Sequence, residues 1–322
     1  MQSLVLRRKN STNVRPGGHG MPPSPRLLGL LSRLAPPLAA AAAEPIFLAT
    51  RRFPAPEPER ELLAEGVAGW VRSGSRTLRC WRWGRLSSPA VLLVHGWNGR
   101  GGQLGALVSP LLAAGYRVVT FDASGHGHSD GHSSSMPRLA TEIEAVAAAH
   151  GPLHGIVAHS LGGLSTVMAL ARGLHARRAV LIAAPAYPRK WFDQMAERLA
   201  LSSRARARLL RRFRRRFGHG FDELAGPRLS RHLGTSALLI HDRDDREVPP
   251  SASHEIASAW PGAQLLLTRG LGHRRILTDP ATIESVVRFI DGDLGRLQRS
   301  APDDHRPRPT TATDAAPIVA AL

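Results

Sequence analysis

The sequence predicts an α/β fold with a mostly parallel sheet covered by helices on both faces. From residue 90 to residue 290, continuous runs of Val, Leu and Ile alternate with longer segments of helical periodicity. An apolar content of 43% is ample for a buried core. No run of about 18 or more uninterrupted apolar residues is present that could cross a bilayer as a helix. We therefore expect a soluble protein of this fold class.

The N-terminal part of the chain differs from the rest. Residues 1–25 are polar and rich in Gly and Pro, and together with residues 295–322 they are predicted to be disordered tails. Residues 26–59 are interpreted as a helical or linker segment. An alternative is a secretory signal at about residues 26–43, because positive charge precedes an apolar stretch with Ala-x-Ala. Arg33 and the Pro36-Pro37 pair interrupt that stretch, which favours a surface helix and a cytoplasmic protein.

A core domain is predicted over residues 60–294, and it begins with a hairpin. The alternating runs GVAGWVR and RTLRCWRW flank Ser73-Gly74-Ser75, and Cys80 in the second run is expected to be a packed thiol. The buried strands AVLLVH, YRVVTFD, LHGIVA, RAVLIAAP, SALLIHD and AQLLLT follow, which gives about eight strands in all. In the first helical segment, one face is formed by Leu104, Leu107, Val108, Leu111 and Leu112.

An insertion at about residues 186–233 interrupts this alternation and is helical in pattern. It would overlie the carboxyl ends of the strands, where ligands bind in parallel sheets, so we interpret it as a lid. Its stretch RARARLLRRFRRRF predicts a basic amphipathic helix with Leu209, Leu210, Phe213 and Phe217 near one face. We expect this apolar face to lie on the substrate cleft. Contact with anionic substrates or lipid surfaces is the alternative.

The net charge of +18 would by itself suggest nucleic acid or an anionic membrane as partner. The basic residues are almost all arginine and are spread along the chain, which indicates a general composition bias. The exception is Arg189 to Phe217, where eleven basic residues oppose two acidic ones. No nucleic-acid-binding motif is present, so we expect no nucleic acid partner. Peripheral contact with an anionic membrane through the Arg-rich insertion stays open, as does the oligomeric state.

Polar residues follow four of the predicted strands. The first strand ends in the glycine-rich HGWNG, whose free backbone N–H groups could stabilise an oxyanion. Ser160 lies on a sharp strand-to-helix turn in GIVAHSLGGLS, where it is either a nucleophile or a turn residue. Asp242, Asp244 and Asp245 follow a later strand, and His273 lies in a Gly-x-Gly-His loop. The order Ser, Asp, His past successive strands is expected when the three converge above one sheet.

The sequence resembles the α/β-hydrolase superfamily from about Gly66 to Leu294. The stretches VHGWNG, FDASGHGHSDG, AHSLGG, LLIHDRDDREVP and GLGHRRILTDP carry the resemblance in order and spacing. The resemblance implies the α/β-hydrolase fold with a helical lid insertion. It also implies a serine hydrolase that cleaves a carboxylic ester, with a small-molecule or acyl-ester substrate and no metal or organic cofactor.

The same resemblance implies roles for particular residues. Ser160 would be the nucleophile and His273 the general base, and the main-chain N–H groups of Trp97 and Leu161 would form the oxyanion hole. The family pattern H-G-x-x-D-x-x-V-P aligns Asp245 with the triad acid and leaves Asp244 as the fallback. Two departures stand out, because Ala158 replaces the first elbow glycine and Asp242 replaces a glycine of the acid loop.

Alternatives remain within and beyond hydrolysis of esters. The same machinery could cleave an amide, a thioester or a carbon–carbon bond. A serine nucleophile disfavours dehalogenase and epoxide hydrolase chemistry, which needs a carboxylate. The fold could also serve as a non-catalytic binding module with a basic lid surface. The cluster of His126, His128 and His132 invites a metal interpretation, but the α/β-hydrolase superfamily has a similar Asp-x-x-Gly-x-Gly-x-Ser loop after this strand, so we expect no metal site.

Overall fold

The computed structural model describes residues 24–292, so the two predicted tails lie almost entirely outside the described residues. The described chain divides into two compact units. The first contains residues 24–49 and 187–225, and the second contains residues 50–186 and 226–292. The first unit thus combines the N-terminal segment with most of the predicted insertion. Among the described residues, no helix is long and apolar enough to span a membrane.

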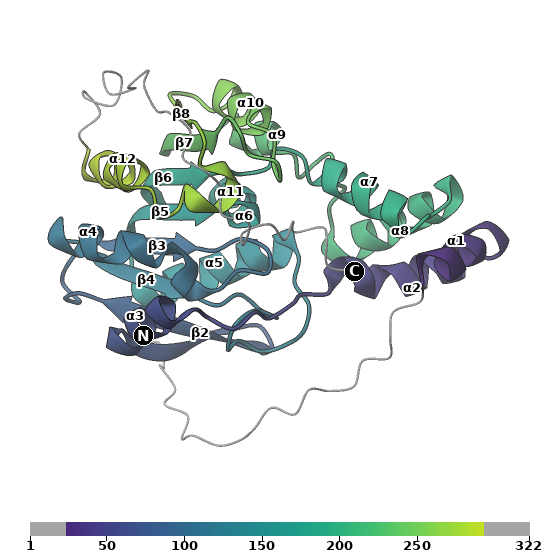
Figure 1. The fold of residues 1–322 in the computed structure, drawn as a ribbon, viewed down its shortest axis with the longest axis horizontal. Helices are drawn as coiled ribbons and strands as arrows, with labels where there is room; N and C mark the ends of the chain where they lie inside the picture. The colour runs from purple at the N-terminus through teal and green to yellow at the C-terminus, as the bar shows by residue number, and fades with distance from the viewer. Residues whose placement is uncertain (1–23, 293–322) are drawn as a thin grey trace. The chain divides into compact units, whose positions relative to one another are not determined.

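The second unit is built on one eight-stranded sheet, drawn in Figure 1. Its order is β1-β2-β4-β3-β5-β6-β7-β8, with β1 and β2 antiparallel and the six strands from β3 to β8 parallel. This confirms the predicted α/β fold class and the initial hairpin. The strands are β1 (Val67–Ser73), β2 (Arg76–Trp83), β3 (Ala90–Val94), β4 (Arg117–Phe121), β5 (Leu153–His159), β6 (Ala176–Ile182), β7 (Ser236–Asp242) and β8 (Gln264–Thr268).

The central parallel strands are mostly buried, because helices cover the sheet. In β3 and β4 every residue is buried, and Cys80 on β2 is a packed thiol as predicted. Burial in apolar surroundings raises the pKa of this thiol, which keeps it protonated. The helices of this unit are α3 (Glu57–Glu65), α4 (Val108–Ala113), α5 (Met136–His150), α6 (Leu161–Ala171), α9 (Gly226–Ser230), α10 (Ser251–Ala259), α11 (Gly272–Arg275) and α12 (Pro280–Asp291).

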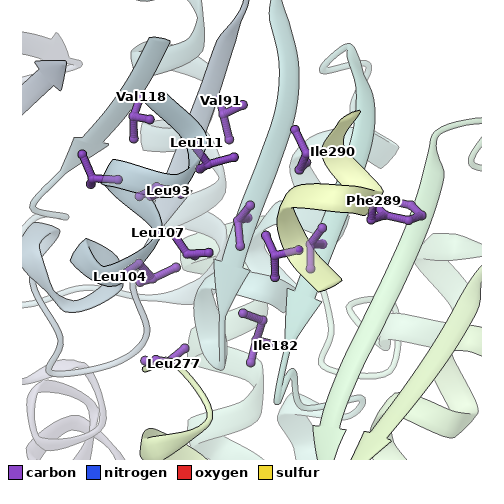
Figure 2. Close-up of a cluster of buried hydrophobic side chains, with 14 of the residues drawn as sticks. Val91, Leu93, Leu104, Leu107, Leu111, Val118, Ile182, Leu277, Phe289 and Ile290 are labelled. Carbon is purple, nitrogen blue, oxygen red and sulfur yellow. The ribbon is translucent and has the colours of Figure 1, made fainter. Parts of the chain in front are cut away.

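A hydrophobic cluster lies between one face of the sheet and the helices α4 and α12 (Figure 2). Side chains from alternate positions of the strands, such as Val91 and Leu93, belong to the same cluster as Leu111 of α4 and Phe289 of α12. These positions alternate because successive strand residues point to opposite faces. The cluster fixes the sheet, and with it the strand ends at which the polar residues lie.

The helix predicted around residues 104–112 forms in two parts. A 3₁₀ helix, η1 (Gly101–Leu107), precedes α4, and Leu104 at φ −96° and ψ 19° departs from helical geometry. Gly101, Gly102 and Gly105 disfavour a regular α-helix here, because glycine loses the most backbone entropy on ordering. The predicted apolar residues nonetheless reach the core, where Leu104, Leu107 and Leu111 are fully or almost fully buried.

The first unit consists of α1 (Pro25–Leu34), α2 (Pro36–Leu48), α7 (Pro188–Arg198) and α8 (Ser203–Phe217). Its core is aromatic. The ring of Phe47 on α2 lies 5.2 Å from Phe192 on α7 and 5.8 Å from Phe213 on α8, and all three side chains are buried. The buried carboxylate of Glu44 adds ion pairs to Arg212 and Arg216 of α8, at 2.6 and 2.8 Å.

This packing corrects one expectation about α8. The apolar residues Leu209 and Phe213 were expected on the substrate cleft. In the structure both are buried, and Phe213 contacts Phe47 of α2 within the first unit. The reason is that the N-terminal segment supplies its own aromatic partner, about 165 residues away along the chain. The lid role of residues 186–233 stays a prediction.

Candidate active site

Ser160 lies at the turn between β5 and α6. Its backbone has φ 52° and ψ −127°, a region that residues other than glycine rarely adopt, and its side chain is buried. The turn brings neighbouring chain segments very close. A Cβ atom on Gly162 would lie 2.4 Å from the carbonyl oxygen of His95, and one on Gly96 would lie 2.9 Å from the Cβ of Ser160. The glycines around Ser160 are therefore a steric requirement of this turn.

Ala158, the departure from the usual elbow pattern, fits the strand. It is fully buried in β5, in register with Val94 on one side and Leu181 on the other. Its φ is not positive, so the position does not need the conformational freedom of glycine. The methyl group is thus compatible with the turn.

His273 reaches the hydroxyl of Ser160 from α11. Its Nε2 lies 3.0 Å from Ser160 Oγ, and its Nδ1 lies 2.7 Å from Oδ2 of Asp245. An ionised carboxylate only accepts hydrogen bonds, so Nδ1 carries the proton in this contact. In the neutral imidazole, Nε2 is then left as the acceptor for the Ser160 hydroxyl. The structure brings these three predicted site residues together in one chain of hydrogen bonds.

Asp245 is held as a carboxylate by donors on both of its oxygens. Oδ1 accepts from the backbone N–H groups of Glu247 and Val248, at 2.8 and 2.9 Å. Oδ2 lies near His273 and 3.3 Å from His241 Nε2. Burial by itself would raise the pKa of Asp245, but the hydrogen bonds from His241, His273 and the Val248 N–H outweigh it and lower this pKa. The side chain is therefore charged at neutral pH.

The other two aspartates of this loop have different partners. Asp242 accepts from Thr268 Oγ1 at 2.8 Å and from the N–H of Leu271 at 3.1 Å, while Asp244 accepts from the N–H of Gly270 at 3.0 Å. Both carboxylates thus hold the segment that precedes His273. The geometry favours Asp245 over the fallback Asp244 as the partner of the imidazole.

Two buried histidines support this arrangement and were given no role by sequence reasoning. His159 donates from Nε2 to the main-chain oxygen of His273 at 2.9 Å, and its ring lies 4.7 Å from the His273 ring. Burial and the nearby His273 lower the pKa of His159 well below its usual value, so it is neutral. His241 contacts Ser253 Oγ at 2.7 Å as well as Asp245. His241 could have been noticed in the sequence, because it occupies the first position of the H-G-x-x-D pattern.

The loop after β3 carries Trp97, one of the two predicted oxyanion-hole residues. Its neighbour Gly96 approaches the Cβ of Ser160, which places the loop beside the hydroxyl. The next N–H, of Asn98, donates to His126 Nε2 at 3.0 Å. Leu161 is the first residue of α6, so its N–H has no carbonyl partner within that helix. The N-terminus of α6 also carries the positive end of the helix dipole.

The histidines of the GHGHSDGH loop have structural partners. His126 donates from Nδ1 to the Ser124 oxygen at 2.9 Å and accepts from Asn98, so it ties this loop to the one that carries Trp97. His128 Nδ1 lies 3.5 Å from a carboxylate oxygen of Asp122. Across residues 24–292, no three His, Cys, Asp or Glu side chains are grouped so as to hold a metal ion.

Acidification from pH 7 to pH 5 is expected to lower the free energy of unfolding. Burial and the nearby His95 lower the pKa of His126 from 6.5 to about 3. Below about pH 6.5 the unfolded state therefore binds a proton that the native state does not, and stability is lost progressively as the pH falls towards 3. His126 alone contributes about 1.4 kcal/mol per pH unit in the middle of this window. The measurement is urea unfolding at several pH values.

The matched variant for this prediction is His126→Gln. Glutamine keeps an acceptor for the Asn98 N–H but cannot be protonated in this range. The slope of stability against pH should therefore be smaller in the variant than in the native chain. An unchanged slope would contradict the assignment.

Comparison with known proteins shows the family of the chain. A sequence model of the alpha/beta hydrolase family matches residues 91–286, more than half of the chain. The chain belongs to the alpha/beta hydrolase family. This α/β hydrolase is 30% identical over 243 residues to a pimeloyl-[acyl-carrier protein] methyl ester esterase of Xanthomonas campestris, covering 63% of this chain and 95% of the relative. It is 26% identical over 253 residues to Escherichia coli RutD, whose name refers to carbamate hydrolysis, covering 62% and 90%.

Among solved structures, the fold is similar to that of the esterase RhEst1 from Rhodococcus sp. ECU1013. The TM-score is 0.52 and the sequence identity 21%, with 70% of this chain and 98% of the esterase covered. This likeness supports the fold. The family and the relatives are esterases and other hydrolases, and the protein is a hydrolase.

Proposed function

We propose that this α/β hydrolase is a serine hydrolase that cleaves a carboxylic ester through an acyl-enzyme on Ser160. The observation that carries the proposal is the pair of hydrogen bonds that joins Ser160, His273 and Asp245, at 3.0 and 2.7 Å. A serine hydroxyl is a weak nucleophile unless a base lies within hydrogen-bond reach, and a third group must orient that base. Both requirements are met by buried side chains.

In the first half of the reaction, His273 Nε2 takes the hydroxyl proton as Ser160 Oγ attacks the ester carbonyl. The charge that develops on the carbonyl oxygen is stabilised by the N–H groups of Trp97 and Leu161. Asp245 holds the Nδ1 proton and stabilises the imidazolium that forms. His273 then gives its proton to the departing alcohol, and the acyl group stays on Ser160.

In the second half, water replaces the alcohol. His273 takes a proton from the water, which attacks the acyl carbonyl, and the same N–H groups stabilise the second tetrahedral intermediate. His273 returns the proton to Ser160 Oγ as the acid is released. The relatives named for methyl ester and carbamate hydrolysis support an acyl bond as the target. At 30% and 26% identity these relatives do not define the acyl group of the substrate, which has to be measured.

Covalent labelling by a fluorophosphonate probe tests the proposal, because this probe reacts only with an activated serine. We expect the native chain to be labelled at Ser160, as located by mass spectrometry of the peptide, and Ser160→Ala to be unlabelled. Short and long p-nitrophenyl esters should compete with the label and be hydrolysed. Folded native protein that stays unlabelled would refute the proposal and favour the non-catalytic binding module. Labelling without hydrolysis of any ester would direct the search to amides, thioesters and carbamates.

A further inference from the structure

The helix α1 presents a row of leucines to solvent. Leu27, Leu30 and Leu34 are spaced i, i+3, i+7 and therefore lie on one face, with exposed fractions of 59%, 56% and 76%. Leu38, in the first turn of α2, is also exposed. Seven large apolar side chains are exposed in the described part of the chain, and these four, which we call the leucine row, lie within twelve residues.

The leucine row points outward because the opposite face of α1 is fixed in the first unit. Leu28 and Ser32 are fully buried. Ser32 Oγ accepts from the N–H of Ser202 at 3.0 Å, and Ser202 Oγ donates to the Ser32 oxygen at 2.6 Å. A helix anchored in this way cannot rotate its leucines inward without breaking these bonds. A concentrated row of this kind is unusual on a protein surface, since scattered apolar residues are normal but contiguous ones are not.

Exposed arginines occur on α1 and on α8 of the same unit. Arg26 and Arg33 are seven residues apart on α1, so they lie together along one side of the row. On α8, Arg204, Arg208, Arg211 and Arg215 recur at i, i+4, i+7, i+11 and form a single stripe about 16 Å long. The stripe contains none of the buried residues of that helix, and all four arginines are exposed.

The arginine stripe is distinct from the arginines that stabilise the fold. Arg212 and Arg216, on another side of α8, pair with the buried Glu44. Within residues 24–292, none of the four stripe arginines forms an ion pair. Packing of the first unit therefore does not require the stripe, and four like charges on one face repel one another.

We propose that the first unit docks on an anionic lipid bilayer. The leucine row enters the boundary between headgroups and acyl chains, Arg26 and Arg33 bind lipid phosphates beside it, and the arginine stripe attracts the negative surface. A bilayer is favoured because it offers both an apolar layer and anionic groups within a few ångströms. Nucleic acid or an acidic protein would match the arginines but would leave the leucine row in water.

The test is co-sedimentation of the full-length protein with vesicles of phosphatidylcholine alone or with about a third phosphatidylglycerol. We expect the partition coefficient to be at least about tenfold higher on the anionic vesicles and to fall with added salt. The triple variant Leu27→Gln, Leu30→Gln, Leu34→Gln should lose at least about tenfold in binding to them. Replacing the four stripe arginines by glutamine should reduce both the binding and its salt dependence.

Matched controls come from the second unit. The triple variant Phe53→Gln, Val67→Gln, Leu86→Gln removes exposed apolar side chains elsewhere, and Arg72→Gln, Arg85→Gln, Arg177→Gln, Arg231→Gln removes the same charge elsewhere. Both should bind nearly as the native chain does, and circular dichroism checks that every variant is folded. The readout does not depend on hydrolysis, so the docking proposal and the proposed function can fail separately.

Three results would overturn the proposal. The first is equal binding to neutral and anionic vesicles. The second is native-like binding by the leucine variant together with equal binding of both chains to soluble polyglutamate, which would indicate an acidic protein partner. The third is a halved molecular mass of the leucine variant in sedimentation, which would show that the leucine row joins two copies of the chain.

Discussion

Replacing Ser160 with alanine is expected to lower kcat for ester hydrolysis by about 10⁵–10⁶-fold, and His273→Ala by a similar factor. Without the hydroxyl no acyl-enzyme forms, and without the imidazole the hydroxyl keeps its proton during attack. Because the two groups act in the same step, the double variant should be no slower than either single variant. Steady-state kinetics with a p-nitrophenyl ester measures all three.

Ser165 provides the matched control for this prediction. It is a fully buried serine of α6, and its hydroxyl has no hydrogen-bond partner among the described residues. Ser165→Ala should change kcat by no more than about twofold, because it removes a buried hydroxyl that has no part in the proposed mechanism. Additive losses in the double variant would contradict a shared role of Ser160 and His273. Activity that survives Ser160→Ala would place the reaction elsewhere.

Asp245→Asn is expected to lower kcat by about 10⁴-fold while the protein stays folded. The amide would present N–H donors to His273 Nδ1, so the imidazole would place its own proton on Nε2. In that tautomer Nε2 faces the Ser160 hydroxyl as a donor and cannot accept its proton. The effect should therefore appear in kcat far more than in KM.

Asp244→Asn is the control that decides between the two candidate acids. The Asp244 carboxylate accepts a hydrogen bond from the Gly270 N–H, and the amide oxygen of asparagine can replace it. We expect a loss in kcat of less than about tenfold, because the imidazole keeps its partner Asp245. A larger loss for Asp244→Asn than for Asp245→Asn would reverse the assignment. Urea unfolding of both variants separates an effect on stability from one on catalysis.

The parallel sheet and the three candidate residues Ser160, Asp245 and His273 could be predicted from the sequence for physical reasons. The strands are buried on both faces, so they appear as continuous apolar runs, and their carboxyl ends meet at one edge of the sheet. Ser160, Asp245 and His273 could therefore be placed near one another without any knowledge of side-chain geometry. The choice of Asp245 over Asp244 needed the resemblance to the family, because three aspartates of one loop differ only in the direction of their side chains.

The packing of the first unit could not be predicted from the sequence. The periodicity of α8 indicates an apolar face but does not say which segment covers it. In the structure Phe47 covers part of that face, and Glu44 of the same helix pairs with two of its arginines. Contacts between segments so far apart along the chain leave no local pattern. For the same reason the sequence shows that His159 precedes Ser160 but does not show that it hydrogen-bonds His273.

The hydrogen bond from His159 to His273 restrains the position of His273 a second time. His159 and Ser160 are consecutive residues of one turn, and both contact His273. His159 hydrogen-bonds the main-chain oxygen of His273, and Ser160 hydrogen-bonds its imidazole ring. When α11 shifts relative to the sheet, the backbone and the ring of His273 are therefore both restrained from the same point. We therefore expect the Ser160–His273 distance to be restrained when the surrounding loops move.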